Sequence, residues 1–483
     1  MNSVHLVKHR RTKDWRFFAP LAASAMALSM VVFGSPAANA APSANASNIL
    51  YSVHPIAIEA SRSLVASGFV PGECIAAVGL ACYGPQTFHT AYQVPWTINN
   101  QLAGTGTQVA IVDAYGSPTV AQDLAAYDAE FGLPAADLHV YYPNGQVTFD
   151  PNAQRGLEVG WAEETSLDVQ TVHALAPGAR INLIVASSPY GNDLNVAERF
   201  AVSNHLGDVM TMSFGSPEVA IKGGGNNLQL QQADAIYRQA SAQGMSVFAS
   251  SGDSGASNGA SVANASFPSS DPFVTAAGGT DLFVAADSNP TPTSTSTDGT
   301  YAGETAWNDS DPTTCPFGCQ YGTFGATGGA PSSVFAAPSY QANVTGQTMR
   351  ETSDVSFNAS VYTATMIYLG FLGGTNNGFY FFGGTSEASP SWAAIAADLD
   401  QAKGSDLGLL NPALYGLVAH ATSYAQDFHD VTVGNNQLPF PSAPGYPSGS
   451  GYDLPTGLGT PIVTGLLNSL APGATFSLSQ PQP

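Results

Sequence analysis

The chain has 483 residues, of which 44% are hydrophobic and only 10% are charged, and its formal charge is −22. This charge argues against nucleic-acid binding, which needs a basic surface. Many carboxylates and few cations suit an acidic medium, because there the carboxyl groups are neutral and few Lys or Arg remain to repel one another. A generic acidic secreted protein would have the same composition.

The first 40 residues predict a secretory signal peptide. Basic residues between Lys8 and Arg16 precede an apolar run over Phe17–Phe33, and residues 38–40 (Ala-Asn-Ala) offer a small-residue cleavage site. No later run in the sequence is long and apolar enough to span a bilayer, so we expect a secreted protein without a membrane anchor. Loss of residues 1–40 removes five of the 13 cations and one acid, which leaves a formal charge near −26.

Residues 41–83 are small and polar, and we expect them to be a short leader with a helical patch near Ile56–Ala66. The four cysteines form two close pairs, Cys74/Cys82 and Cys315/Cys319. In an exported chain these pairs indicate two local disulfides, and zinc fits less well because no His or acidic partners follow at finger spacing. Four cysteines are few for this length, so a hydrophobic core must carry the fold.

From Thr107 onward, buried strands alternate with amphipathic helices. The run Gln-Val-Ala-Ile-Val-Asp after Thr107 predicts a buried parallel strand with Asp113 at its carboxyl end. This alternation predicts a doubly wound α/β fold with a mainly parallel sheet and helices on both faces. The other predicted elements are helices at Val120–Phe131, Trp161–Leu175, Asp193–Asn204 and Asn227–Gln243, and strands at Arg180–Ala186, Asp208–Ser213 and Ser246–Ser250.

One domain is expected over residues 84–470. Residues 286–300 are rich in Ser, Thr, Pro and Asp and predict a low-complexity surface loop. The tail, residues 471–483, is expected to fray. No internal repeat and no second core are evident.

Ser386 is the candidate nucleophile. It lies in Gly-Gly-Thr-Ser-Glu-Ala-Ser-Pro, between an aromatic strand at Phe379–Phe382 and a predicted helix that contains Trp392. A Gly-rich strand-to-helix turn exposes the serine and places it beside the positive end of the helix, which stabilises an oxyanion. Pro390 fits the first turn of that helix. A capping serine in a glycine turn is the alternative.

Three acids have the spacing of catalytic groups. Glu164 and Asp168 are four residues apart and share one face of a mostly apolar helix, whereas Glu163 points away. Two carboxylates stacked in this way shift each other's pKa values, as the acids of an active site do. The alternative is a solvent-exposed acidic helix face, which has the same spacing. Asp253 lies between Gly252 and Gly255, directly after the strand Ser246–Ser250, where α/β folds place ligand groups. The alternative is an aspartate that caps a glycine turn. None of the nine histidines precedes Gly-Thr, so a Ser-His-Asp triad lacks its base.

Together these residues resemble the sedolisin family of serine-carboxyl peptidases, from about residue 83 to residue 470. Gly384-Thr385-Ser386-x-x-x-Pro390 is similar to the nucleophile motif, and Glu164-x-x-Leu167-Asp168 to the base helix. Further matching motifs, in order, are Ser213-Phe214-Gly215-x-x-Glu218, Ser250-Ser251-Gly252-Asp253-Ser254-Gly255, Phe267-Pro268, Gly278-Gly279-Thr280 and Trp307-Asn308-Asp309.

The resemblance implies a subtilisin-like fold and an acid-active endopeptidase that forms an acyl-enzyme. Ser386 would attack the peptide carbonyl, Glu164 would move its proton, and Asp168 would orient Glu164. Protonated Asp253 would donate to the oxyanion, which requires acidic pH. Asp113 corresponds to a further family acid. The run Ser213, Phe214 and Gly215 would bind the substrate backbone as an added strand.

The resemblance also implies one Ca²⁺ ion in a C-terminal loop. Asp430 and Asp453 would supply carboxylates, and Val431, Gly449 and Gly451 backbone carbonyls. Family precursors usually carry a long prodomain, whereas about forty residues separate the cleavage site from the domain here. How the enzyme is kept inactive is therefore open.

Two other functions compete with this interpretation. A subtilisin-type Ser-His-Asp protease would use Asp113 as its acid, but His-Gly-Thr is missing and Asp253 replaces the amide expected at the oxyanion. An inactive secreted binding protein could keep the fold, but all the catalytic groups are present. Protein or peptide substrates and a monomer are expected.

Overall fold

The computed structural model describes residues 48–53, 55–60, 69–153, 156–223, 227–285, 299–315, 325–418, 421–439 and 443–481. The predicted signal peptide lies outside the described residues, as do residues 286–298 of the low-complexity loop.

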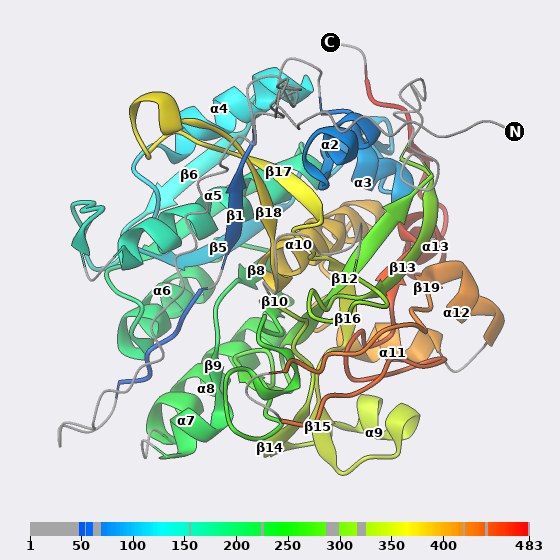
Figure 1. The fold of residues 1–483 in the computed structure, drawn as a ribbon. Coiled ribbons are helices and arrows are strands. Elements are labelled where there is room, and N and C mark those ends of the chain that lie inside the picture. Colours follow the sequence, from blue (N-terminus) through cyan, green and yellow to red (C-terminus); the bar gives the residue numbers. More distant parts are fainter. Residues whose placement is uncertain are drawn as a thin grey trace, which may run out of the picture.

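Most described strands of the core belong to one twisted sheet of eight strands, shown in Figure 1. All of its pairings are parallel except that between β12 and β13. In spatial order the strands are β13 (Tyr301–Ala306), β12 (Thr275–Val284), β10 (Ser246–Ser250), β8 (Val209–Met212), β5 (Gln108–Ala114), β7 (Arg180–Ala186) and β6 (Asp137–Tyr141), with β16 (Val355–Asn358) also beside β12.

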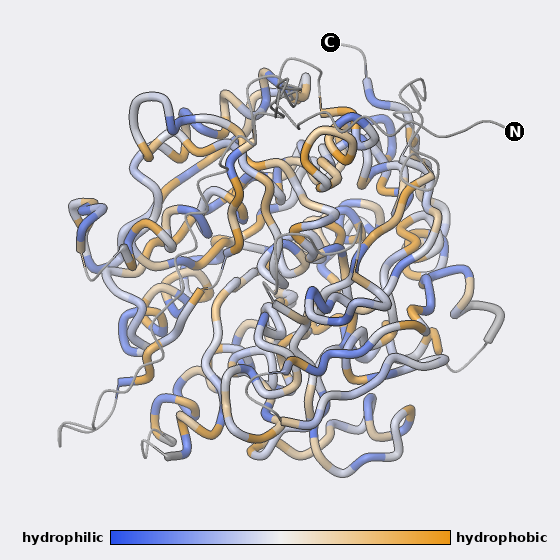
Figure 2. The backbone as a smooth tube through the Cα atoms, in the orientation of Figure 1, coloured by the Kyte–Doolittle hydropathy of each residue, from blue (hydrophilic) through white to orange (hydrophobic). Residues whose placement is uncertain are grey.

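Successive residues of the central strands face two separate cores. On one face Ile111 and Leu183 pack against helices α4 (Val120–Phe131), α5 (Leu157–Leu175) and α10 (Thr385–Lys403). On the other face Val112 and Ile184 pack against α6 (Gly191–Ser203) and α8 (Asn227–Ala242). The strands are apolar on both sides, as expected of a covered parallel sheet. The outer helices instead alternate between hydrophobic and hydrophilic residues, as the tube of α8 shows in Figure 2.

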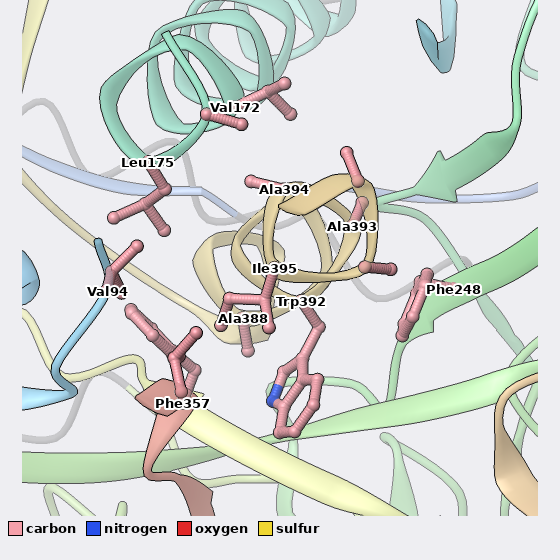
Figure 3. Packing of buried hydrophobic residues seen from close by; sticks show 14 of the residues in the cluster. Val94, Val172, Leu175, Phe248, Phe357, Ala388, Trp392, Ala393, Ala394 and Ile395 are labelled. Atoms are coloured by element: carbon pink, nitrogen blue, oxygen red, sulfur yellow. The ribbon is translucent and has the colours of Figure 1, made fainter. Parts of the chain in front are cut away.

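Helix α10 lies at the centre of the molecule. Its residues Trp392–Ile395 are fully buried, and Figure 3 shows them between Val172 and Leu175 of α5, Phe357 of β16 and Phe248 of β10. The indole Nε1 of Trp392 donates to the Ser356 carbonyl at 2.8 Å, so the one polar atom of this side chain is satisfied. The residues that begin this helix are therefore held rigidly.

A second sheet of four described strands lies beside α5 and α10, in the order β1 (Ile56–Glu59), β18 (Gly378–Gly383), β17 (Thr363–Leu369) and β2 (Ala81–Tyr83). The predicted helical patch near Ile56–Ala66 is wrong for its described part, because Ile56–Glu59 pairs with β18 as an antiparallel strand. Residues 61–68 lie outside the described part of the chain. The expected leader is thus joined to the sheet that ends at the predicted nucleophile.

The remaining described elements surround these two sheets, and the tail is also paired. Phe476–Ser477 forms an antiparallel pair with Thr97–Ile98, so this part of residues 471–483 does not fray as predicted. The other helices are α2 (Pro71–Val78), α3 (Pro85–Ala91), α7 (Glu218–Gly223), α9 (Ser339–Thr345), α11 (Asn411–Leu417), α12 (Ala421–Asp427) and α13 (Val463–Leu470). The other strands are β3 (Thr97–Ile98), β4 (Gln101–Leu102), β9 (Ser216–Pro217), β11 (Ser266–Phe267), β14 (Pro331–Ala336), β15 (Met349–Glu351), β19 (Phe428–His429), β20 (Thr460–Pro461) and β21 (Phe476–Ser477).

Among the described residues, no helix has the length and apolar character to cross a bilayer.

Candidate active site

Ser386 is the second residue of α10 and follows directly on the turn that ends β18. Gly384 between them has φ +127°, and a Cβ there would lie 2.8 Å from Oδ2 of Asp253, so a glycine is required at this position. The helix begins earlier than predicted: Pro390 lies inside it rather than in its first turn. Pro390 has no N–H to offer the Ser386 carbonyl, and the Ser213 hydroxyl lies 3.2 Å from that oxygen instead.

Glu164 and Asp168 project from α5 into the same buried space as Ser386. Both are fully buried, which excludes a solvated acidic face. Burial, followed by the charges of Asp168 and Asp113, raises the pKa of Glu164 well above its usual range. The Ser386 hydroxyl lies close enough to lower that pKa, although it does not form a hydrogen bond of ordinary length with Glu164. Hydrogen bonds between a catalytic base and its nucleophile are often longer than usual when no substrate is bound.

Asp168 and Asp113 complete the buried acidic cluster. Oδ1 of Asp168 accepts a 2.7 Å hydrogen bond from the Ser213 hydroxyl, and its Oδ2 has no hydrogen-bond partner among the described residues. Burial raises the pKa of Asp168 well above its usual range, and the Asp113 charge adds to that rise. Asp113, the sixth residue of β5, has its pKa raised to about 7, mainly by burial. Three buried carboxyls that interact this closely titrate as a coupled group and not one by one.

Glu163 is buried too, but it does not belong to this cluster. Its pKa is raised to about 8 by burial, and its charge acts on Tyr380 rather than on Glu164. The five-residue offset from Asp168 thus separates it from the other acids, as predicted from the helix geometry.

Asp253 faces the start of α10 from the loop that follows β10. Its Oδ1 accepts from the Thr385 amide at 2.8 Å and from the Thr385 hydroxyl at 2.6 Å. Both of these bonds are accepted by the same oxygen, Oδ1. The Asp253 charge also raises the pKa of Glu164, which places the two carboxyls in one electrostatic site.

The predicted backbone-binding run follows β8. The Ser213 hydroxyl donates a hydrogen bond to Asp168 and lies near the Ser386 carbonyl. It therefore connects α5, which carries Glu164, to α10, which carries Ser386. Phe214 is buried and packs edge-on against Tyr51 with ring centroids 5.3 Å apart. Gly215 exchanges two backbone hydrogen bonds with Ser52: Ser52 N–H to Gly215 O at 3.1 Å, and Gly215 N–H to Ser52 O at 3.2 Å. Sequence reasoning missed this pair because no pattern connects residues 163 positions apart.

A small cavity of about 40 Å³ opens at these residues. Its lining contains Ser386 and Asp253, the run from Ser213 to Gly215, and also Ser52 and Val53 from the expected leader. The candidate nucleophile, the candidate oxyanion donor and the candidate backbone-binding residues therefore share one cavity.

Three of the described histidines, His89, His173 and His429, are engaged elsewhere. The two ring nitrogens of His89 lie 2.9 Å from the carbonyls of Val94 and Ala174, and Nε2 of His173 lies 2.9 Å from the Pro134 carbonyl. His429 stacks on Tyr301 with ring centroids 3.7 Å apart. None of these rings is among the groups that act on Glu164.

The two aspartates predicted to bind calcium lie close together in the C-terminal loop. Asp430 accepts from the Gly451 amide at 3.1 Å and from the Tyr424 hydroxyl at 2.9 Å. Asp453 accepts from the Gly449 amide at 2.9 Å, and its pKa is raised to about 6 by burial, with the Asp430 charge a minor cause. Within the described ranges, no group of three or more His, Cys, Asp or Glu side chains has the arrangement of a metal site.

Cys74 and Cys82 form a disulfide between α2 and β2. Cys319 lies outside the described residues, so the Cys315–Cys319 pairing stays a prediction.

Comparison with known proteins agrees with this geometry. A model of the "Subtilase family" matches residues 145–429, which is more than half of the chain. Kumamolisin from Bacillus sp. (strain MN-32) is 32% identical over 415 residues, 83% of this chain and 65% of its own length. Sedolisin from Pseudomonas sp. (strain 101) is 30% identical over 387 residues, 77% of this chain and 58% of its own length. This chain thus spans less than two thirds of the length of these relatives.

The structure of Pseudomonas sedolisin, described as a serine-carboxyl proteinase complexed with two molecules of pseudo-iodotyrostatin, shares the fold at a TM-score of 0.65. It is 28% identical, and the match covers 80% of this chain and 97% of that one. The predicted subtilisin-like α/β fold is therefore confirmed. On the family model, the relatives and this shared fold, the chain belongs to the subtilase family and, within it, to the sedolisins, with kumamolisin among its relatives.

Proposed function

We propose that this protein is a secreted serine-carboxyl endopeptidase that hydrolyses protein or peptide substrates at acidic pH. One observation carries the proposal: the Ser386 hydroxyl approaches the buried carboxyl of Glu164, which stands against Asp168 and Asp113. A buried acid beside a serine at a helix N-terminus supplies both parts of an activated nucleophile. No described histidine is among the groups that shift the pKa of Glu164.

The residues can carry out acyl transfer with balanced proton movements. Ser386 Oγ attacks the peptide carbonyl carbon while Glu164 accepts the hydroxyl proton. When the C–N bond breaks, Glu164 returns this proton to the leaving amine, and water then repeats the sequence on the ester. Protonated Asp253 would donate from Oδ2 to the oxyanion, beside the Ser386 amide at the positive end of α10.

Acidic pH is expected for two reasons. Glu164 can hold the negative charge only if Asp168 and Asp113 are protonated, because each of their charges raises its pKa. Asp253 can donate to an oxyanion only in its neutral form. Raising the pH would remove the protons of Asp168, Asp113 and Asp253, so activity should fall on the alkaline side.

The proposal includes one bound Ca²⁺ ion, export by residues 1–40 and a monomeric state. Asp430 and Asp453 fit a hard cation, because two carboxylates of the C-terminal loop lie close together and no described Lys or Arg forms an ion pair with either. They would hold the ion together with the carbonyls of Val431, Gly449 and Gly451, and the ion would cancel their mutual repulsion and stiffen the loop.

The test compares hydrolysis of a denatured protein at acidic pH by wild type, Ser386→Ala, Glu164→Gln and Glu163→Gln. Glu163→Gln is the matched control, because Glu163 is also buried, on the neighbouring position of α5, but lies outside the acidic cluster. We expect loss of activity in the first two variants and retention in the control. Activity that survives both Ser386→Ala and Glu164→Gln would refute the proposed function.

A further inference from the structure

Asp253 lies on a loop, residues 251–255, whose main chain is held by a segment distant in the sequence. The Ala326 amide donates to the Asp253 carbonyl at 3.1 Å, and the Gly255 amide donates to the Ala326 carbonyl at 3.0 Å. Ala326 belongs to residues 325–328, here named the brace, which are buried throughout. The brace therefore supports the main chain on both sides of the Asp253 side chain.

The brace and the loop are in direct backbone contact. An added Cβ at Gly325 would lie 2.8 Å from the Asp253 carbonyl oxygen. An added Cβ at Gly328 would overlap the Ser251 carbonyl oxygen, and the Gly328 amide donates to the Gly252 carbonyl at 2.6 Å. Glycines allow this close approach of two main chains. Because packed groups leave no slack, a shift of the brace is transmitted to Asp253.

Asp309 holds the other side of the brace. Its Oδ2 accepts from the Gly325 amide at 3.2 Å, and its own amide donates to the Gly325 carbonyl at 3.0 Å. Its Oδ1 accepts from the indole Nε1 of Trp307 at 3.0 Å. That indole lies against Gly325, where an added Cβ would be 2.8 Å from Cζ2 of the ring. The Asp309 side chain thus fixes Gly325 both directly and through Trp307.

Asp309 is a buried carboxyl that the proposed mechanism leaves unused. It is only 3% exposed, and it is not among the residues that line the cavity of the candidate active site. Burial raises its pKa to about 7, and a charge on Asp253 adds to that rise. The two carboxyls therefore lie within electrostatic range of each other.

We propose that Asp309 is a positioning residue of the reaction: it holds the brace, and the brace holds Asp253 in place to donate to the oxyanion. This inference rests on the proposed function for the oxyanion role of Asp253. An oxyanion donor acts only when it is preorganised, and a misplacement of about 1 Å can cost about 10²-fold in rate. Asp309 is remote from the predicted backbone-binding run, so its effect falls on kcat and leaves KM unchanged.

The first test measures kcat and KM for wild type, Asp309→Asn, Asp253→Ala and the double variant. Asparagine has the same size but only one acceptor oxygen, so the N–H of Gly325 or of Trp307 loses its partner. We expect Asp309→Asn to lower kcat about tenfold or more with KM unchanged, and to cause no further loss in the Asp253→Ala background. A merely structural role would lower activity by the same factor in both backgrounds, and that result would overturn the proposal.

Asp311→Asn is the matched control. Asp311 lies two residues further along the chain and accepts from Thr313 and Asn435 rather than from the brace. It should keep the kcat of wild type. If Asp309→Asn does not fold, Gly325→Ala takes its place, because the added Cβ would push the Asp253 carbonyl without changing any carboxyl group. Unchanged kcat in a folded Asp309→Asn or Gly325→Ala variant would overturn the proposal.

The second test does not depend on hydrolysis. Amide hydrogen exchange is measured in Ser386→Ala and in the same protein with Asp309→Asn added. The Thr385 amide is the probe, because it donates to Oδ1 of Asp253 at 2.8 Å. We expect Asp309→Asn to speed exchange at Thr385, while the Leu183 amide of β7, which reports global opening, keeps its rate.

The outcomes of this second test separate the proposal from the proposed function. Unchanged exchange at Thr385 would overturn the positioning role of Asp309 even if wild type is an active peptidase. Equal acceleration at Thr385 and Leu183 would also overturn it, because the variant would then act on global stability alone. Faster exchange at Thr385 alone, in a protein that hydrolyses no peptide, would support the positioning of Asp253 by Asp309 while refuting the proposed peptidase function.

Discussion

Replacing Glu198 by glutamine should raise the free energy of unfolding, relative to that of the parent, by more at neutral pH than at acidic pH. Glu198 lies on α6, is only 2% exposed, and accepts a 3.1 Å hydrogen bond from the Tyr237 hydroxyl at Oε1, while Oε2 has no partner in the described part of the chain. Burial, partly offset by that hydrogen bond, raises its pKa from 4.5 to about 7. Glutamine keeps the size and an acceptor for Tyr237, but it cannot ionise.

The sign and size of the effect follow from proton linkage. Below about pH 4.5 the carboxyl is protonated in both the folded and the unfolded state, so its contribution to stability is fully present. Between pH 4.5 and about 7 the unfolded state loses the proton and the folded state keeps it, so wild-type stability falls as pH rises. At about 1.36 kcal/mol per pH unit, this loss amounts to about 3 kcal/mol.

The assay is chemical unfolding of Glu198→Gln and its parent in a Ser386→Ala background, which prevents self-digestion. The difference in unfolding free energy between variant and parent should grow by about 3 kcal/mol from about pH 4 to about pH 8. Glu130→Gln removes the same group from an exposed position of α4 and serves as the control, with no such growth expected. Parallel stability curves for Glu198→Gln and its parent would refute the reasoning.

Three further predictions concern the site and the loops. Asp253→Ala should lower turnover about 10²–10³-fold, because it removes an oxyanion donor. Asp253→Asn keeps a donor, so it should retain more activity and extend it to higher pH. If both variants fold well and are equally inactive, the oxyanion role is contradicted. Excess chelator should lower the melting temperature of calcium-loaded protein, because an ion that binds only the folded state stabilises it; an unchanged melting temperature would rule out the calcium loop. Gly384→Ala should cost about 1–3 kcal/mol of stability from backbone strain, and it should also lower turnover because the added Cβ would displace Asp253. Gly404→Ala, at the other end of α10 with open space around its Cβ, should lower stability without changing turnover. Equal turnover in the two variants would show that Gly384 does not act through Asp253.

Elements with strong local patterns could be predicted from the sequence. The bounds predicted for α4, β7 and β10 agree with the structure, because their apolar periodicity is uninterrupted. The positions of Glu164 and Asp168 on one helix followed from their spacing, and the structure brings Glu164 to Ser386 and Asp168 to Ser213. Residues with local signals were thus placed near the site in advance.

Features set by distant partners could not be predicted. Ile56–Glu59 looked helical, but the β18 edge makes it a strand, and β18 lies more than 300 residues away. Pro390 suggested a helix start, yet α10 begins at Thr385, and the Ser213 hydroxyl lies 3.2 Å from the Ser386 carbonyl that the proline cannot serve. The attachment of Ser52 to Gly215 has no sequence signal, because backbone groups are the same in every residue.

The central claim is that a carboxyl group, and no histidine, activates Ser386. The most direct measurement is kcat/KM against pH, from about pH 2 to about pH 8, for wild type, Glu164→Gln and His54→Ala, since Val53, the sequence neighbour of His54, lines the cavity that contains Ser386. The account predicts an acidic maximum for wild type, no measurable hydrolysis by Glu164→Gln and an acidic maximum retained in His54→Ala. A maximum near neutral pH that persists in Glu164→Gln and disappears in His54→Ala would contradict it.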